Sequence, residues 1–108
     1  RRLLHERRVV SGELAGLVNA HPVRSGSAVW LADRASLMIN EEDHLRVQSL
    51  RSGFAVEAAF AEAMAVDRGL GAVLPYSFHP DFGFLTSCPT NVGTGIRASV
   101  LIHLPGLV

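Results

Sequence analysis

The chain has 108 residues, of which 48% are hydrophobic and 19% charged, so it has the length of one domain and a globular rather than disordered composition. Ten basic residues balance ten acidic ones, which argues against a broad electrostatic surface for nucleic acid or anionic lipid. No apolar run approaches the length of a membrane-spanning helix. The single cysteine, Cys88, cannot form an internal disulfide, which favours a reducing cytoplasm.

All ten basic residues are arginine. Codon bias in a GC-rich genome is one explanation. The other is functional, because arginine makes planar, bidentate contacts with phosphate and carboxylate groups. The chain begins at Arg1 without a methionine and stops in an apolar stretch at Val108, which suggests a segment of a longer protein and a single partial domain over residues 1–108.

The first part of the chain predicts helix, then loop. Residues 1–10 have leucine and arginine pairs at helical spacing and predict the end of a helix. Residues 11–17 predict a short helical turn capped by Ser11. Residues 21–27 hold proline, glycine and two serines, which is typical of a loop.

The hydrophobic period then changes to that of strands. Two apolar runs, residues 28–32 and 35–40, flank Asp33-Arg34 and predict a hairpin. Residues 42–50 alternate and predict a third strand, with Leu45 and Val47 on one face. The opposite face would carry four polar residues: Glu42, His44, Arg46 and Gln48.

The second half predicts one long helix followed by short elements. Residues 54–70 are rich in alanine and carry one apolar stripe, which predicts a helix. Residues 76–84 predict a turn between two short strands, residues 88–95 a loop, and residues 98–104 a closing strand. The large aromatic residues are expected in the core: Trp30, Phe54, Phe60 and Phe84. This order favours an α+β fold, an antiparallel sheet with packed helices.

The first candidate site is the sequence NEEDHLRVQ, residues 40–48, which follows an apolar strand directly. A solvated strand end or turn would account for its three consecutive acids. On an extended strand, however, four residues span roughly 13 Å. Glu42 and Arg46 would then be too far apart to pair, and would hold a cation and an anion at opposite ends of one ligand. A metal site is less favoured, because consecutive side chains point to alternate faces.

The second candidate is TSCPTNVGTGIR, residues 86–97. Its glycines and small residues expose backbone N–H groups that can cradle an anion, although a plain connecting loop is the better explanation of this feature taken alone. It lacks the lysine and spacing of a Walker A loop. Arg97 supplies a second guanidinium for phosphate. Cys88 is either a small buried hydrophobe or a thiolate activated by a nearby positive charge.

These two segments, in this order, resemble the guanidino (phosphagen) kinase family. NEEDHLRV is similar to the family's acidic strand motif, and LTSCPTNVGTGIRASV to its cysteine-loop signature. HLRVQSL and SVLIHLP most resemble the bacterial protein-arginine kinases. Leu101 stands where many members of the family carry a histidine. The family's second catalytic carboxylate and further phosphate-binding arginines are expected outside this segment.

The resemblance implies a part of a guanidino-kinase catalytic domain that uses ATP and Mg²⁺. It implies that Glu42 and Cys88 are catalytic and bind the guanidinium acceptor, together with Asn91. It also implies that the nucleotide contacts His44, Arg46 and Arg97. The acceptor would be an arginine side chain of a protein, in the cytoplasm, with no nucleic acid or membrane partner; a homo-oligomer is compatible with this. A non-catalytic module that binds arginine or phosphoarginine, and a structural relic, are the two rival hypotheses.

Overall fold

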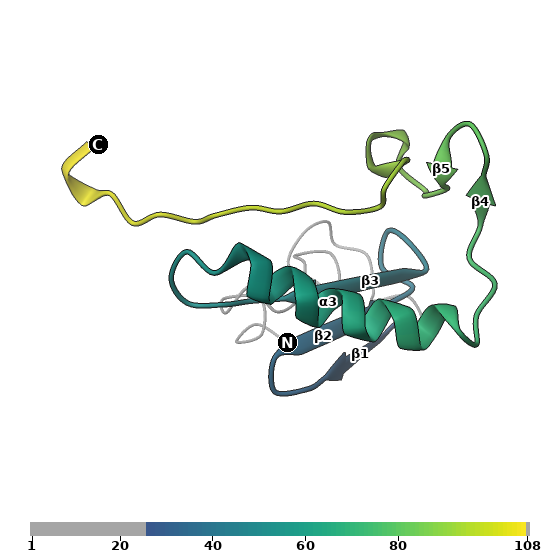
Figure 1. Ribbon diagram of the computed structural model, residues 1–108, viewed down its shortest axis with the longest axis horizontal. Helices are drawn as coiled ribbons and strands as arrows, with labels where there is room; N and C mark the ends of the chain where they lie inside the picture. The colour runs from purple at the N-terminus through teal and green to yellow at the C-terminus, as the bar shows by residue number, and fades with distance from the viewer. Residues whose placement is uncertain (1–25, 108) are drawn as a thin grey trace.

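The computed structural model describes residues 26–107 (Figure 1). The helix expected at residues 1–10, the turn at residues 11–17 and most of the loop at residues 21–27 lie outside the described residues. Among the described residues, strands and a helix are combined as the α+β prediction expects. No helix in this part of the chain is long and apolar enough to cross a membrane.

The predicted hairpin is the first half of a three-stranded antiparallel sheet. Strands β1 (Ala28–Leu31), β2 (Ala35–Ile39) and β3 (Leu45–Ser49) lie in the order β1-β2-β3. The central strand β2 has neighbours on both sides and holds the buried hydrophobic side chains of the described residues, Leu37 and Met38. The sheet therefore fixes β3, and the turn that leads into it, against the best-packed strand.

Helix α3 (Val56–Gly71) confirms the predicted long helix and packs against β3 and β2 (Figure 1). Alanine has the highest helix propensity. Glu57 in the first turn and Arg68 in the last turn also complement the helix dipole. These local preferences explain why the helix forms where the sequence predicts it.

A polar cluster around Glu62 joins α3 to the end of the sheet. Ser49 Oγ donates a hydrogen bond to Glu62 Oε2 at 2.8 Å, and Arg51 Nε donates to the same oxygen at 3.0 Å. Arg51 also contacts the second Glu62 oxygen through Nη2. Arg34 Nη1, from the β1–β2 turn, lies 3.7 Å from Glu62 Oε1. One partly buried carboxylate thus gathers groups from the β1–β2 turn and from the end of β3, which lie at the same end of the sheet.

The two predicted short strands follow the helix. They are β4 (Phe78–His79) and β5 (Gly83–Phe84), which pair antiparallel. Tyr76 attaches them to α3, because its hydroxyl donates to the Asp67 carbonyl at 3.3 Å and its ring packs edge-on against Phe84. Burial, and secondarily the charge of Asp67, raises the pKa of Tyr76 above its ordinary value. This tyrosine therefore stays neutral in any physiological buffer.

Gly83 allows β5 to lie against the end of the cysteine-containing loop. Phe84 N–H donates to the Gly93 carbonyl at 2.8 Å, and Gly93 N–H donates back at 3.2 Å. Gly83 has a φ of +81°, and a Cβ atom there would lie 2.4 Å from the Gly93 oxygen. Only glycine fits this approach without moving the loop.

The closing strand predicted at residues 98–104 is wrong. This segment runs extended along the molecule and belongs to no sheet (Figure 1). Its apolar residues alternate as expected, but a strand also needs a neighbouring backbone to pair with. No such partner pairs with it among residues 26–107, and Leu101 is 80% exposed.

The expectation that the large aromatic residues form the core is also wrong. Phe54 is 86% exposed, and about half of the surface of Trp30 and Phe60 is exposed. Phe84 is 38% exposed, although it contacts two other rings. The small sheet and its one described helix bury little more than β2, so hydrophobicity alone overestimates burial here.

The Glu62 cluster predicts a substantial loss of stability on substitution. We expect Glu62→Ala to lower the free energy of unfolding by about 1–3 kcal/mol, because it removes hydrogen bonds to a charged group and leaves Arg51 and Ser49 without their acceptor. Equilibrium urea unfolding measures this change. Glu57→Ala, on the exposed face of the same helix, is the matched control. It should lower the free energy of unfolding by only a few tenths of a kcal/mol. Equal losses for the two variants would contradict the role of the cluster.

Two glycine substitutions are expected to have opposite effects on stability, because Gly83 lies close to Gly93 whereas Gly69 has open space around it. We expect Gly83→Ala to destabilise the protein by about 1–3 kcal/mol, because of the clash with the Gly93 carbonyl and the positive φ. Gly69→Ala, inside α3 with open space around it, should stabilise by up to about 1 kcal/mol. Thermal or urea unfolding tests both. A harmless Gly83→Ala would show that the β5 contact with the loop is not needed.

Candidate functional site

Residues 40–44 form a tight turn between β2 and β3, so the strand predicted from residue 42 begins only at Leu45. Asn40 N–H donates to the His44 carbonyl at 2.9 Å and closes the turn. Asn40 has a φ of 53°, a left-handed conformation that asparagine tolerates better than most residues. Its amide donates to the Gly26 carbonyl at 3.1 Å, and Ser27 Oγ donates to the Asn40 carbonyl at 2.7 Å. We call residues 40–44 the acidic turn.

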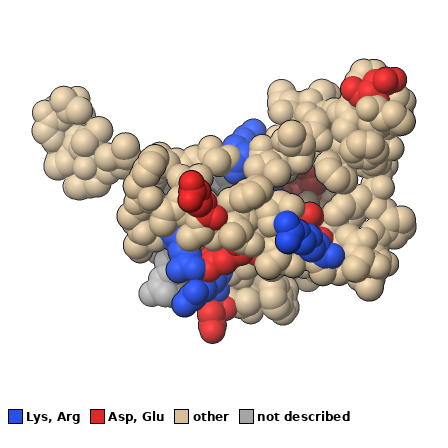
Figure 2. Space-filling view, viewed as in Figure 1, with Lys and Arg blue, Asp and Glu red and all other residues tan. Residues whose placement is uncertain are grey.

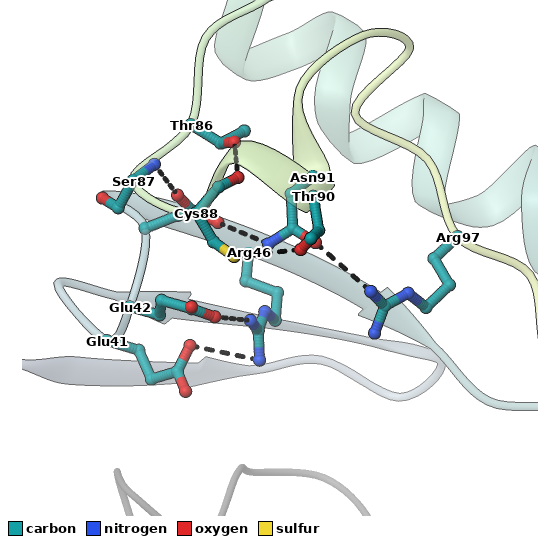
Figure 3. A network of polar contacts seen from close by, with 10 residues as sticks. Glu41, Glu42, Arg46, Thr86, Ser87, Cys88, Thr90, Asn91 and Arg97 are labelled. Atoms are coloured by element: carbon teal, nitrogen blue, oxygen red, sulfur yellow. Dashed lines mark hydrogen bonds and ion pairs between the residues drawn. The ribbon is translucent and has the colours of Figure 1, made fainter.

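The acidic turn brings Glu42 back beside Arg46. Arg46 Nη2 donates to Glu42 Oε2 at 3.1 Å, and Arg46 Nη1 lies 3.2 Å from Glu41 Oε2 (Figure 3). The expectation that Glu42 and Arg46 are held apart at opposite ends of a ligand is therefore wrong. The reason is that the chain bends where the alternating pattern suggested an extended strand. His44 is exposed and ends the turn, just before β3 begins.

The environment of the two glutamates differs sharply. The Glu41 side chain is 2% exposed and that of Glu42 is 47% exposed. Glu41 Oε2 has an ion pair with Arg46 but no hydrogen bond of good geometry. Glu41 therefore acts as a fixed buried negative charge under Arg46, whereas Glu42 is accessible to a second positively charged group.

The second candidate segment folds as the predicted loop around Cys88. A 3-10 helix, η1 (Pro89–Asn91), follows the cysteine. Thr86 Oγ1 donates to the Cys88 carbonyl at 2.7 Å, and the Cys88 sulfur lies 2.9 Å from Thr90 Oγ1 (Figure 3). Local hydrogen bonds thus hold the thiol in one place, half-buried and next to a hydroxyl. We call residues 86–95 the cysteine loop.

Asp43 joins the acidic turn to the cysteine loop. Ser87 N–H donates to Asp43 Oδ1 at 2.6 Å, and Asn91 Nδ2 approaches Asp43 Oδ2 at 3.4 Å. Asn91 Oδ1 in turn accepts a hydrogen bond from Arg97 Nη2 at 3.3 Å (Figure 3). Nothing in the sequence distinguishes Asp43 from the two acids before it. Its only signal was its place inside the acidic triplet, because the contact partners lie more than 40 residues away.

The structure thus brings together five of the six predicted site residues, leaving His44 at the edge. They are Glu42, Arg46, Cys88, Asn91 and Arg97, which lie around the contact between turn and loop (Figure 3). Two guanidinium groups from separate segments, β3 and the chain after the loop, suit phosphate oxygens. An accessible carboxylate beside them suits a cation. Such a surface can hold an anionic and a cationic group next to each other.

Charge in the site is mixed rather than of one sign, because Glu41 and Glu42 both pair with Arg46. On the face drawn in Figure 2, arginine and acidic side chains lie next to one another. A shallow hollow near the β1–β2 turn, lined by residues 32–36, Gln48 and Leu50, contains none of the candidate residues. Within residues 26–107, no three His, Cys, Asp or Glu side chains are grouped as a metal site.

Comparison with known proteins assigns the chain to a family. Residues 1–108 match the family described as ATP:guanido phosphotransferase, C-terminal catalytic domain. A protein named protein-arginine kinase from Shouchella clausii is 46% identical over 108 residues, which cover 99% of this chain and 29% of the relative. Proteins of the same name from Bacillus mycoides and Bacillus cereus are 45% identical over the whole chain and 29% of their own length. The chain therefore spans less than a third of the curated relatives that it matches, and it belongs to the ATP:guanido phosphotransferase family.

Proposed function

We propose that the protein containing this chain transfers the γ-phosphoryl group of ATP to the guanidino group of an arginine side chain in another protein. Membership of the family supports the reaction, and the names of the relatives support a protein acceptor. The single observation that carries the proposal is the contact between the acidic turn and the cysteine loop. Asp43 of the turn that carries Glu42 contacts Ser87 and Asn91 of the loop that carries Cys88, and Asn91 accepts a hydrogen bond from Arg97, which supports one shared site for these residues.

Glu42 is proposed to bind and orient the acceptor arginine. Its accessible carboxylate already holds a guanidinium, that of Arg46, at 3.1 Å, so its charge and position suit this group. Phosphorylation forms an N–P bond and requires that the attacking nitrogen lose a proton. Glu42 is placed to accept that proton as a general base. Cys88 and Asn91 border the same position and would fix the plane of the guanidinium.

Arg46, Arg97 and His44 are proposed to bind the nucleotide. During transfer, the O–P bond to the β-phosphate breaks and ADP leaves with its electron pair, so negative charge must be neutralised on the leaving side. Two guanidiniums supply that neutralisation with a fixed geometry. Arg46 would turn from Glu42 to the phosphates, and Glu42 would exchange it for the acceptor guanidinium. Glu42 and Arg46 would then each have an oppositely charged partner both before and after the substrates bind.

Mg²⁺ is proposed to arrive with ATP. Its ligands in such sites are mainly phosphate oxygens and waters, with one or two carboxylates from the protein. The carboxylates of the acidic turn already have partners, Arg46 for Glu41 and Glu42 and the Ser87 N–H for Asp43. Phosphate oxygens and waters are therefore proposed to hold the ion without them. Bound Mg²⁺ would neutralise phosphate charge, while the protein groups align the two substrates.

The remaining proposals concern context. Residues 1–108 are proposed to be one part of a larger catalytic domain, working on protein substrates in the cytoplasm. No nucleic-acid partner is proposed, because ten acidic residues balance the ten arginines of the chain. A homo-oligomer is compatible with the exposed apolar side chains that β1 and α3 carry.

Replacing the proposed base tests the reaction. We expect Glu42→Gln in the full-length protein to lower the rate of ATP-dependent, acid-labile arginine phosphorylation by about 100-fold or more, because the neutral amide neither attracts the guanidinium nor accepts its proton. The assay uses labelled ATP and an arginine-containing protein. Glu57→Gln on α3 is the matched control and should retain full activity.

Near-normal activity of Glu42→Gln would remove Glu42 from the mechanism. If the unsubstituted protein binds phosphoarginine without any turnover, the rival hypothesis of a non-catalytic binding module replaces the proposal.

Replacing the proposed phosphate arginines tests the nucleotide site. We expect Arg97→Ala to raise KM for ATP about tenfold or more while KM for the acceptor changes little, because one guanidinium–phosphate contact is worth more than about 1.4 kcal/mol. Arg46→Ala should act in the same direction. Steady-state kinetics with each substrate varied separately measures this. Arg68→Ala, on the exposed end of α3, is the control. A larger effect on the acceptor than on ATP would reverse the assignment of the two sides.

A further inference from the structure

We infer that Asp43 is the positioning residue that aligns the two halves of the site. Its carboxylate connects the acidic turn, which carries Glu42, to the cysteine loop, which leads to Arg97. This inference rests on the proposed function for its catalytic consequence, but the connection itself is a property of the fold. Asp43 itself contacts neither substrate in this assignment; it acts through Ser87 and Asn91.

The contact with Ser87 is the stronger of the two. Its N···O distance of 2.6 Å is that of a charge-assisted hydrogen bond from a backbone N–H to a carboxylate, which is about twice as strong as a neutral one. Ser87 directly precedes Cys88. The bond therefore holds the backbone at the point from which the thiol projects.

The contact with Asn91 passes the alignment on to the arginine. Asn91 Nδ2 faces Asp43 Oδ2 at 3.4 Å, and Asn91 Oδ1 accepts from Arg97 at 3.3 Å. Because an aspartate only accepts, it selects the amide orientation in which the Asn91 nitrogen faces Asp43 and the oxygen faces Arg97. Asp43 thereby controls the contact that holds the Arg97 guanidinium.

Asp43 is itself rigidly mounted. The turn that carries it is closed by the Asn40–His44 hydrogen bond and continues into strands on both sides. The far end of the cysteine loop is attached separately, through the paired hydrogen bonds of Gly93 with Phe84. Within residues 26–107 the loop thus has these two attachments, and the one through Asp43 connects it to the acidic turn.

Hydrogen exchange on the full-length protein tests this connection without any assay of activity. In Asp43→Ala, we expect the Ser87 amide to exchange at least tenfold faster, because its acceptor is gone, while the amides of β2 and β3 keep their protection. Asp81→Ala is the matched control, because this 81% exposed carboxylate lies in the β4–β5 turn. It should leave Ser87 unchanged. Unchanged exchange at Ser87 in Asp43→Ala would overturn the inference.

Exchanging the side chains of Asp43 and Asn91 tests whether Asp43 orients Arg97 through Asn91. This test also decides the inference if Asp43→Ala loosens the sheet. Asp43→Asn alone sets two amide nitrogens against each other, and Asn91→Asp alone sets two carboxylates against each other. The double variant restores a donor and an acceptor at every contact and leaves an acceptor for Arg97. We expect each single variant to lower kcat/KM for ATP at least tenfold, and the double variant to recover most of that loss.

If the losses in kcat/KM of the two single variants simply multiply in the double variant, the action of Asp43 through Asn91 is overturned.

The test of Asp43 can be told apart from the test of the proposed function. If the unsubstituted protein does not phosphorylate arginine, the proposed function fails. The exchange rate of the Ser87 amide still decides whether Asp43 ties the loop to the turn.

Discussion

The five-residue turn between β2 and β3 is the constraint on which the site depends. Its first residue, Asn40, adopts a left-handed conformation and closes the turn through the His44 carbonyl. An extended chain at this point would send Glu42 and Asp43 to opposite faces of the sheet. The bend places Glu42 against Arg46 and directs Asp43 to the cysteine loop. One backbone conformation thus sets the position of three acidic side chains.

Charge pairing makes this crowding of acids tolerable. Three adjacent carboxylates would repel one another, but each has a compensating group: Arg46 for Glu41 and Glu42, and the Ser87 N–H for Asp43. The exposed pair of Glu42 and Arg46 is worth only about 0–1 kcal/mol. It can therefore exchange partners at little cost. The buried Glu41 has no such freedom, since an uncompensated charge there would be costly.

The same division between fixed and exchangeable contacts runs through the described residues. The Glu62 cluster and the Gly83 approach fix the helix and β5. The contacts of Asp43 fix the loop on the turn. Glu42, Arg46 and Arg97, by contrast, are partly exposed and bound through flexible side chains. A scaffold held by buried polar contacts, with exposed charged groups at its surface, is suited to bringing two charged substrates together.

The hairpin, the helix α3, the pair β4 and β5, and the family could all be predicted from the amino-acid sequence. Each of these depends on local propensity or on the identity of contiguous residues. The sequence could not distinguish an extended strand from a turn at Glu42, since both suit the same polar residues. Nor could it reveal the Asp43–Ser87 contact, which joins residues 44 positions apart. It predicted a strand at residues 98–104 because alternation reports a strand's faces, whereas pairing depends on a neighbour that only the tertiary structure supplies or withholds.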